Sequence, residues 1–271
     1  MSTVVPPTNL DVTDWVVGHY SYKMVVSLQF GRALGLALMC GIGACDATDS
    51  EPLGPPVFVR VTIANVSAPG ALQTTQGAQD VLLSAGVWSV HDLGAPLIDP
   101  GASAPAGIEL LAEEGDPTQL FADLMDAEQE GSVGTFGSRR PGENYAENPL
   151  SPGEAVEFSF WAEGDQALSF GAMFGASNDV LVGLGDGDGV LIHELEVGET
   201  RDISSAVQLW DVGTERNEEP GVGASQPGQQ MGVGAGEAEG GTVMAIDEVD
   251  VAGYRYPAVA SFVRVTVERS E

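Results

Sequence analysis

Two short segments of the sequence contain the acidic side chains whose types and spacing suggest chemistry. Asp211 and Glu215 lie four residues apart, where an apolar run and a Trp lead into Asp-Val-Gly-Thr-Glu. Gly213 between them allows the backbone to turn sharply. Asp179 lies upstream, in a polar Ser-Asn-Asp turn that opens another apolar run. Carboxylates held close together repel one another unless a cation lies between them, so our hypothesis is that Asp179, Asp211 and Glu215 converge on one calcium ion.

Calcium suits this set of donors. It takes about 6–8 oxygen ligands at about 2.3–2.6 Å, from carboxylates, backbone carbonyls and water. Three side chains from two loops, together with carbonyls and water, would suffice. No His or Cys belongs to the set, which argues against zinc. The alternative is that these acids are solvated loop residues of an acidic protein, and the residues alone leave both interpretations open.

The composition limits the possible partners. The chain has 271 residues, with 10 Lys and Arg against 40 Asp and Glu, for a net charge of −30. Such a surface repels nucleic acid and anionic lipid, so we expect no nucleic-acid partner. The hydrophobic content of 43% is enough for a real core, and the 36 Gly and 16 Pro residues favour a turn-rich, mainly β structure.

The N-terminal part has the pattern of an export signal. Residues 24–45 combine a weakly basic start with an apolar run that is too short to span a bilayer permanently, followed by small residues before Cys45. This end resembles a bacterial lipobox, which implies export, lipid attachment at Cys45 and an envelope location. Met24 is then the expected start, with residues 1–23 an over-extended reading. An ordinary cleaved signal or a short buried helix are the alternatives.

The two cysteines, Cys40 and Cys45, both lie in this leader, so no disulfide is expected in the folded part. The polar, Pro-rich residues 46–56 are expected to form a tether.

The remaining chain, 57–271, has the pattern of one β-rich domain. Alternating or apolar runs predict strands over 57–66, 155–161, 168–174, 180–184, 207–210 and 261–267. The first and last of these are similar and are expected to be edge strands or neighbouring strands. Residues 180–184 and 190–195 are expected to form a hairpin.

Two short helices are expected between the strands. The first covers 106–115, with Ile108, Leu111 and Ala112 on one face, and the second covers 120–125. The Gly- and Glu-rich residues 216–241 predict a long mobile loop. About eight to ten short strands at this spacing predict a mainly β, antiparallel two-sheet sandwich with short helices on one side.

Three segments together resemble the spondin domain, the adhesive domain of F-spondin and mindin that also occurs in bacterial exported proteins. They are Ala106–Gly115, Ser177–Gly183 and Leu209–Glu215, in the order found in that family. The resemblance covers about 57–217 and the last strand. It implies a β-sandwich resembling C2 domains, with a calcium site in the loops at one end.

The family's metal carboxylates correspond to Asp179, Asp211 and Glu215. The chain departs from the family pattern in three ways. Glu215 replaces an Asp, Val180 replaces an aromatic residue, and the family's disulfide cysteines are absent.

These observations predict a non-catalytic, exported, calcium-binding module. It would act in adhesion or in cell-surface and extracellular interaction with a protein or glycan, and would reach a membrane only through a lipid at Cys45. His91 and His193 stand apart from any nucleophile motif and are expected to be structural. Two alternatives are an envelope glycan hydrolase with paired carboxylates and a metal-free structural envelope module.

Overall fold

The computed structural model describes residues 55–127, 132–138, 148–184, 189–249 and 253–270. The leader predicted over 24–45, with Cys40 and Cys45, lies outside these ranges, as does most of the predicted tether. Within the described ranges, no helix is both long enough and apolar enough to cross a membrane.

The smaller of the two main sheets joins the two ends of the domain. Its strands are β1 (Val57–Asn65), β6 (Ala155–Ala162), β10 (Thr200–Asp202) and β13 (Val263–Ser270). They lie in the order β10–β13–β1–β6. Strand β1 pairs antiparallel with β13, with Val61 opposite Val267, which confirms that the two similar strands are neighbours. Val59 and Val61 are fully buried, as expected from their alternation with exposed or half-buried residues.

The larger sheet contains seven strands. They are β4 (Leu83–His91), β5 (Val133–Phe136), β7 (Ala167–Phe174), β8 (Val180–Leu184), β9 (Val190–Leu191), β11 (Val207–Asp211) and β12 (Met244–Ala245). The main path is β12–β11–β8–β7–β4–β5, and β9 pairs with β7. A separate two-stranded ribbon is formed by β2 (Leu72–Thr74) and β3 (Gly77–Gln79).

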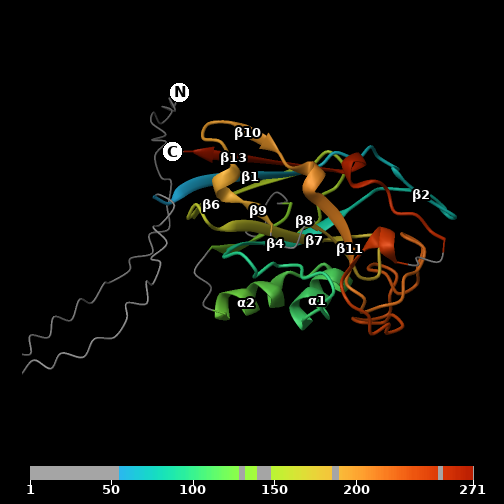
Figure 1. Cartoon of the computed structure of the whole chain (residues 1–271). Coiled ribbons are helices and arrows are strands. Elements are labelled where there is room, and N and C mark those ends of the chain that lie inside the picture. The colour runs from blue at the N-terminus through green and yellow to red at the C-terminus, as the bar shows by residue number, and fades with distance from the viewer. Residues whose placement is uncertain (1–54, 128–131, 139–147, 185–188, 250–252, 271) are drawn as a thin grey trace, which may run out of the picture. The chain divides into compact units, whose positions relative to one another are not determined.

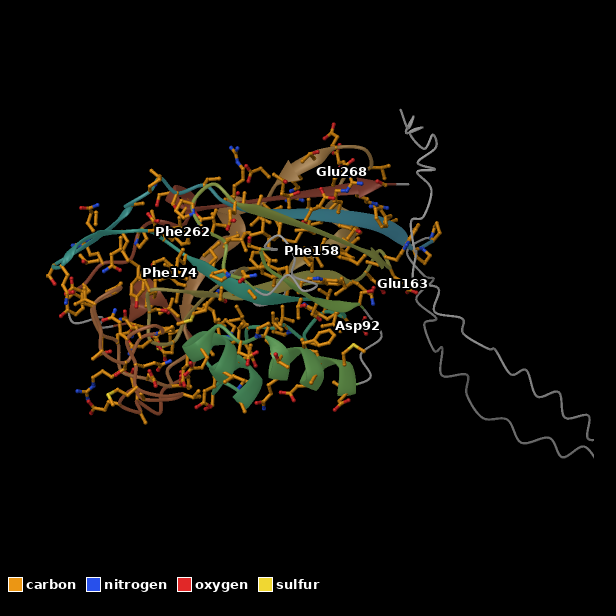
Figure 2. The ribbon with its side chains drawn as sticks, turned by 180° about the vertical axis from the view of Figure 1, so that it is seen from behind. Asp92, Phe158, Glu163, Phe174, Phe262 and Glu268 are labelled. Carbon is orange, nitrogen blue, oxygen red and sulfur yellow. The ribbon has the colours of Figure 1, made fainter. Side chains whose placement is uncertain are left out.

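The two main sheets and a pair of helices form three layers (Figure 1). One core lies between the sheets and includes Phe170, Phe174 and Phe262, and Figure 2 shows the last two close together. A second core lies on the other face of the larger sheet, beneath α1 (Ala106–Glu114) and α2 (Thr118–Asp126). Strands β7 and β8 are therefore buried at every residue. The mainly β, two-sheet architecture with short helices on one side is confirmed.

Helix α1 ends where the sequence predicts. Gly115 adopts a left-handed conformation with φ 67°, and its N–H donates to Leu111 C=O at 3.0 Å. A side chain at Gly115 would also collide with Ser84, because its Cβ would lie 2.7 Å from the Ser84 Cβ. Ile108, Leu111 and Ala112 are buried against the sheet, as expected.

The expected hairpin between 180–184 and 190–195 is wrong. Strand β9 covers only Val190–Leu191 and pairs with β7, and Ile192–Glu194 form a 3₁₀ turn. Met173 pairs with Leu181, whereas Leu168 pairs with Val190, so the pairing shifts by four residues along the same edge of β7. Strands β8 and β9 therefore lie one after the other along the same edge of β7. Residues 190–191 pair with the part of this edge that β8 leaves uncovered and do not turn back to pair with β8.

Truncation of the helix face should destabilise the domain. Leu111 is fully buried between α1 and the larger sheet. We expect Leu111→Ala to lower the free energy of unfolding by about 2–5 kcal/mol, because the lost side chain leaves a cavity. Urea unfolding measures this change. The matched control is Leu93→Ala, where the side chain is 56% exposed and little change is expected; equal effects of the two substitutions would contradict this packing.

Candidate functional site

Neighbouring strand ends bring Asp179 and Asp211 together. Asp179 immediately precedes β8, and Asp211 is the last residue of β11, where it lies opposite Val180 in the antiparallel pair. The Val212 N–H donates to the Asp179 carbonyl at 3.1 Å and extends this pairing into the loop. The Ser177 hydroxyl accepts from the Val180 N–H at 3.1 Å and donates to the Phe174 carbonyl at 2.7 Å, which fixes the preceding turn.

The carboxylate of Asp179 is completely buried and only half satisfied. Its Oδ2 accepts from the N–H groups of Thr214 at 2.8 Å and Glu215 at 2.9 Å, and from the Thr214 hydroxyl at 3.3 Å. Its Oδ1 is buried without any hydrogen-bond partner. A buried oxygen of this kind lacks the interactions it had in water, which destabilises the folded state. Among the atoms of the site, Asp179 Oδ1 therefore has the greatest need of a binding partner.

Asp211 is 2% exposed, and both of its carboxylate oxygens accept hydrogen bonds. Oδ1 accepts from the Gly213 N–H at 2.8 Å, and Oδ2 accepts from the Asn217 side-chain amide. Asn217 in turn accepts from the Tyr256 hydroxyl at 3.2 Å. Gly213 has φ 73°, and a Cβ there would lie 2.7 Å from the Thr242 nitrogen. The sharp turn inferred from Gly213 is therefore present.

Glu215 joins the site through its main chain more than through its carboxylate. Its N–H donates to Asp179, whereas its Oε1 accepts from the Gly236 N–H at 2.7 Å. The Asn178 side chain also acts on the Glu215 carboxylate as a hydrogen-bond donor, whereas the charges of Glu114 and Glu218 repel it. The structure thus pairs Asp179 with Asp211. In the described ranges, no group of three or more His, Cys, Asp or Glu side chains is arranged to hold a metal ion.

Among the residues that the structure describes, no cationic side chain forms an ion pair with these buried acids. The ion pairs among the described residues lie elsewhere, for example between Arg216 and Glu237 at 3.3 Å. Burial, and then the charge of Asp211, raise the pKa of Asp179 to about 7 against the opposing hydrogen bonds from Glu215 and Thr214. Burial also raises the pKa of Asp211 and of Glu215. The arrangement therefore favours either bound protons or a bound cation.

The sequence did not single out several polar residues that hold the site together. Asn178 accepts at Oδ1 from the Glu218 N–H at 3.1 Å and from the Gln226 side chain at 3.2 Å, and it donates to the Glu218 carboxylate at 3.1 Å. In the sequence, the only indication that Asn178 belongs to the site was its position next to Asp179. Residues 216–241 contain no helix or extended strand, as expected for a loop, but these bonds tie the first part of the loop to the site.

His91 and His193 both have hydrogen-bond partners, as expected of structural residues. His91 is 2% exposed and contacts the Asp92 carbonyl at 2.8 Å and the Ser169 hydroxyl at 2.7 Å. His193 lies in the 3₁₀ turn, where Nδ1 contacts the Gly164 carbonyl at 3.0 Å.

The stability of the cation-free protein should fall as the pH rises. The pKa of Asp179 is about 7 in the folded protein, against about 3.9 for an Asp in an unfolded chain. The folded state therefore binds more protons between these values, and the free energy of unfolding decreases as the pH rises through this window. With chelator present, we expect the urea midpoint to fall between about pH 4.5 and pH 7.5, and Asp179→Asn to weaken this dependence.

The decrease in stability with rising pH should persist in part in Asp179→Asn, because burial also raises the pKa of Glu113 to about 7. Asp165→Asn, at an exposed position, is the matched control and should keep the full dependence. A midpoint that rises with pH in the wild-type protein would contradict the assignment.

Comparison with known proteins adds no identification at this point. No protein-family model matches the chain, and a search of curated proteins finds no significant match. The function is therefore argued from the site itself.

Proposed function

We propose that the chain is an exported, non-catalytic β-sandwich module that binds calcium at the loop end of its larger sheet. Asp179 and Asp211 would be the central ligands, with Glu215 in the same loop. The module would act in adhesion or in another cell-surface or extracellular interaction with a protein or glycan. The resemblance of three sequence segments to the spondin domain supports the same proposal.

One observation carries the proposal: two fully or almost fully buried aspartates act on each other electrostatically, with no cationic side chain paired to either in the described ranges. The donor chemistry fits calcium. All the groups are oxygen donors, and Asp179 Oδ1 is free to bind. The amide oxygen of Asn178 already accepts two hydrogen bonds, so carbonyls and water are left to complete the coordination.

The burial of the acids favours this function over glycan hydrolysis. A glycosidase needs two carboxyl groups that flank the scissile bond and reach the substrate. Asp179 is 0% exposed and Asp211 is 2% exposed, so a sugar cannot approach them without rearrangement of the loops. A metal-free structural module is the remaining alternative. In that case the aspartate pair would hold a proton, and chelator would not change stability.

Calcium should stabilise the protein through Asp211. Ligand at about 100 times its Kd adds about 2.7 kcal/mol, which corresponds to about 5–10 °C in Tm for a domain of this size. We expect this rise in wild type and its loss in Asp211→Asn, because the substitution removes one ligand charge but keeps the shape. Thermal unfolding with calcium chloride and with chelator measures it.

Asp165→Asn is the control for the charge change, since Asp165 is exposed and distant in sequence from both aspartates. It should retain the calcium response. Equal Tm values in calcium and in chelator for the wild-type protein would eliminate calcium binding and favour the metal-free module.

The proposed lipid anchor can be tested on a matched pair of cysteines. If Cys45 carries the lipid, Cys45→Ser should abolish incorporation of radiolabelled fatty acid and move the protein from the membrane fraction to the soluble fraction. Cys40→Ser lies in the same leader and should change neither property. Unchanged labelling of Cys45→Ser in a lipoprotein-processing bacterial host would refute the anchor.

A further inference from the structure

An open cleft of about 510 Å³ lies at one end of the two main sheets. Its lining comes from Pro56 before β1, from Asp92 after β4, and from the end of β6 with the turn that leads into β7. That turn precedes the first residue of β7, whereas Asp179 follows the last one, so the cleft and the aspartate site lie at opposite ends of this strand. Figure 2 shows Asp92 and Glu163 at the end of the domain away from Phe174.

The aromatic wall of the cleft is Trp161, whose side chain is 59% exposed. Trp88 and Trp210, the other tryptophans in the described ranges, are 8% and 4% exposed. Trp161 lies opposite Phe58 in the pairing of β6 with β1, and the two rings meet at 5.4 Å between centroids with their planes inclined by 59°. Phe58 therefore supports the indole on one side, and the exposed remainder of the ring is held in place for a ligand.

The turn after β6 is fixed by hydrogen bonds that leave its acidic side chains outside. The Glu163 N–H donates to the Gln166 side-chain oxygen at 2.9 Å, and the Gln166 N–H donates to the Glu163 carbonyl at 3.2 Å. The ring of His193 bonds to the Gly164 carbonyl at 3.0 Å. Gln166 is buried, whereas Glu163 and Asp165 are exposed and line the cleft. Two carboxylates thus extend from a defined backbone into the cleft that contains the indole.

Three carboxylates line the cleft without a basic partner. Asp92, Glu163 and Asp165 take part in no ion pair among the described residues, and no Lys or Arg belongs to the described lining. Arg60, the basic residue of β1, is already paired with acids of the two neighbouring strands at 3.4 and 3.5 Å. The net charge of −30 adds to the negative potential around the cleft. An aromatic face and unpaired acids in one cleft are complementary to an organic cation.

The balance of donors and acceptors favours a guanidinium group over a sugar. Carboxylates only accept hydrogen bonds, whereas sugar hydroxyls need donors as well as acceptors from their site. A guanidinium has five N–H donors and no acceptor, binds a carboxylate through two parallel hydrogen bonds and stacks on aromatic faces. Free arginine also carries its own carboxylate, which the three acids would repel. An arginine within a polypeptide has no such charge.

We propose that this cleft binds an arginine side chain presented by a segment of a partner protein. The guanidinium would stack on Trp161 and donate to Glu163, and Asp92 and Asp165 would strengthen the attraction. The inference goes beyond the calcium-binding function, because it assigns a ligand class to the opposite end of the domain and does not require calcium to bind.

An NMR titration of the full chain tests the inference, in the presence of chelator so that the result is independent of the calcium site. The probes are acetyl-Gly-Arg-Gly-amide and the same peptide with citrulline, which has the shape of arginine without its charge. We expect the arginine peptide to shift the Trp161 indole N–H signal and the backbone amide signals of Gly164 and Asp165, and the citrulline peptide to shift them far less. Equal shifts with both peptides, or none with either, would overturn the inference.

Two further probes separate this ligand from other candidates. Free L-arginine should bind more weakly than the arginine peptide, and equal or tighter binding would overturn the assignment to a protein segment. A hexasaccharide of β-1,4-linked glucose should leave the same signals unchanged. If it binds more tightly than the arginine peptide, the cleft is a sugar site and the proposal falls.

Substitutions separate the aromatic contribution from general attraction to an acidic surface. Trp161→Leu keeps an apolar side chain beside Phe58 but removes the π face, so the Kd measured from the amide signals of the turn should rise about two- to fivefold. Glu163→Gln should also raise the Kd, whereas Glu109→Gln, the same change at an exposed position on α1, should not. An unchanged Kd in Trp161→Leu, or equal effects of the two glutamate substitutions, would contradict the proposal. The comparison of the two peptides uses only the wild-type protein, so it decides the question even where a variant fails to fold.

Discussion

The repulsion between the buried carboxylates of Asp179 and Asp211 is the constraint that the loop end of the domain must satisfy. Their positions follow from the sheet, because antiparallel pairing of β8 with β11 places the start of one strand beside the end of the other. In the surrounding loop, the main-chain N–H groups of Gly213, Thr214 and Glu215 donate hydrogen bonds to these carboxylates. These donors stabilise negative charge but supply no positive charge, so the balance is left to protons or to a cation.

The same loop end is where the layers of the molecule meet. The acids come from the larger sheet, Glu113 comes from α1, and Tyr256 comes from the segment that leads into β13. Tyr256 packs edge-on against Phe174, at 5.4 Å between ring centroids, and so connects Asn217 and Asp211 to the core between the sheets. Burial and the charges of Asp179 and Asp211 raise the pKa of Tyr256, which keeps its hydroxyl a donor. Charge at the site is thus coupled to packing in the core.

Local periodicity was sufficient to predict most of the scaffold. Strands such as β1 and β6 alternate with period two because one face lies in the core, and α1 shows its buried face through Ile108, Leu111 and Ala112. The similar sequences of β1 and β13 suggested edge or neighbouring positions, and the structure makes the two strands neighbours. The hairpin at 180–195 was wrong because proximity in sequence favoured a turn, whereas the free edge of β7 offered the better partner.

The candidate site was only partly predictable, because some of its residues meet only through tertiary structure. Asp179 and Asp211 stand out because each lies at a strand end beside a turn residue. Glu113 does not stand out, since Glu-Glu near a helix end resembles a solvated face, although the Glu113 side chain is buried in the structure. Asn217 and Tyr256 lie 39 residues apart and meet through tertiary structure alone. Sequence spacing cannot reveal a contact of this kind.

The central place of β1 in the smaller sheet determines when this domain can fold. Strand β1 lies between β6 and β13, so its partners are about 100 and 200 residues away along the chain. One edge of β1 can pair once β6 has been made, but the other edge has no partner until β13 is available. Such non-local pairing makes folding slower than in proteins whose contacts are mostly local. Until both partners have been synthesised, β1 keeps an unpaired edge, and completion of the smaller sheet waits for the segment that carries β13.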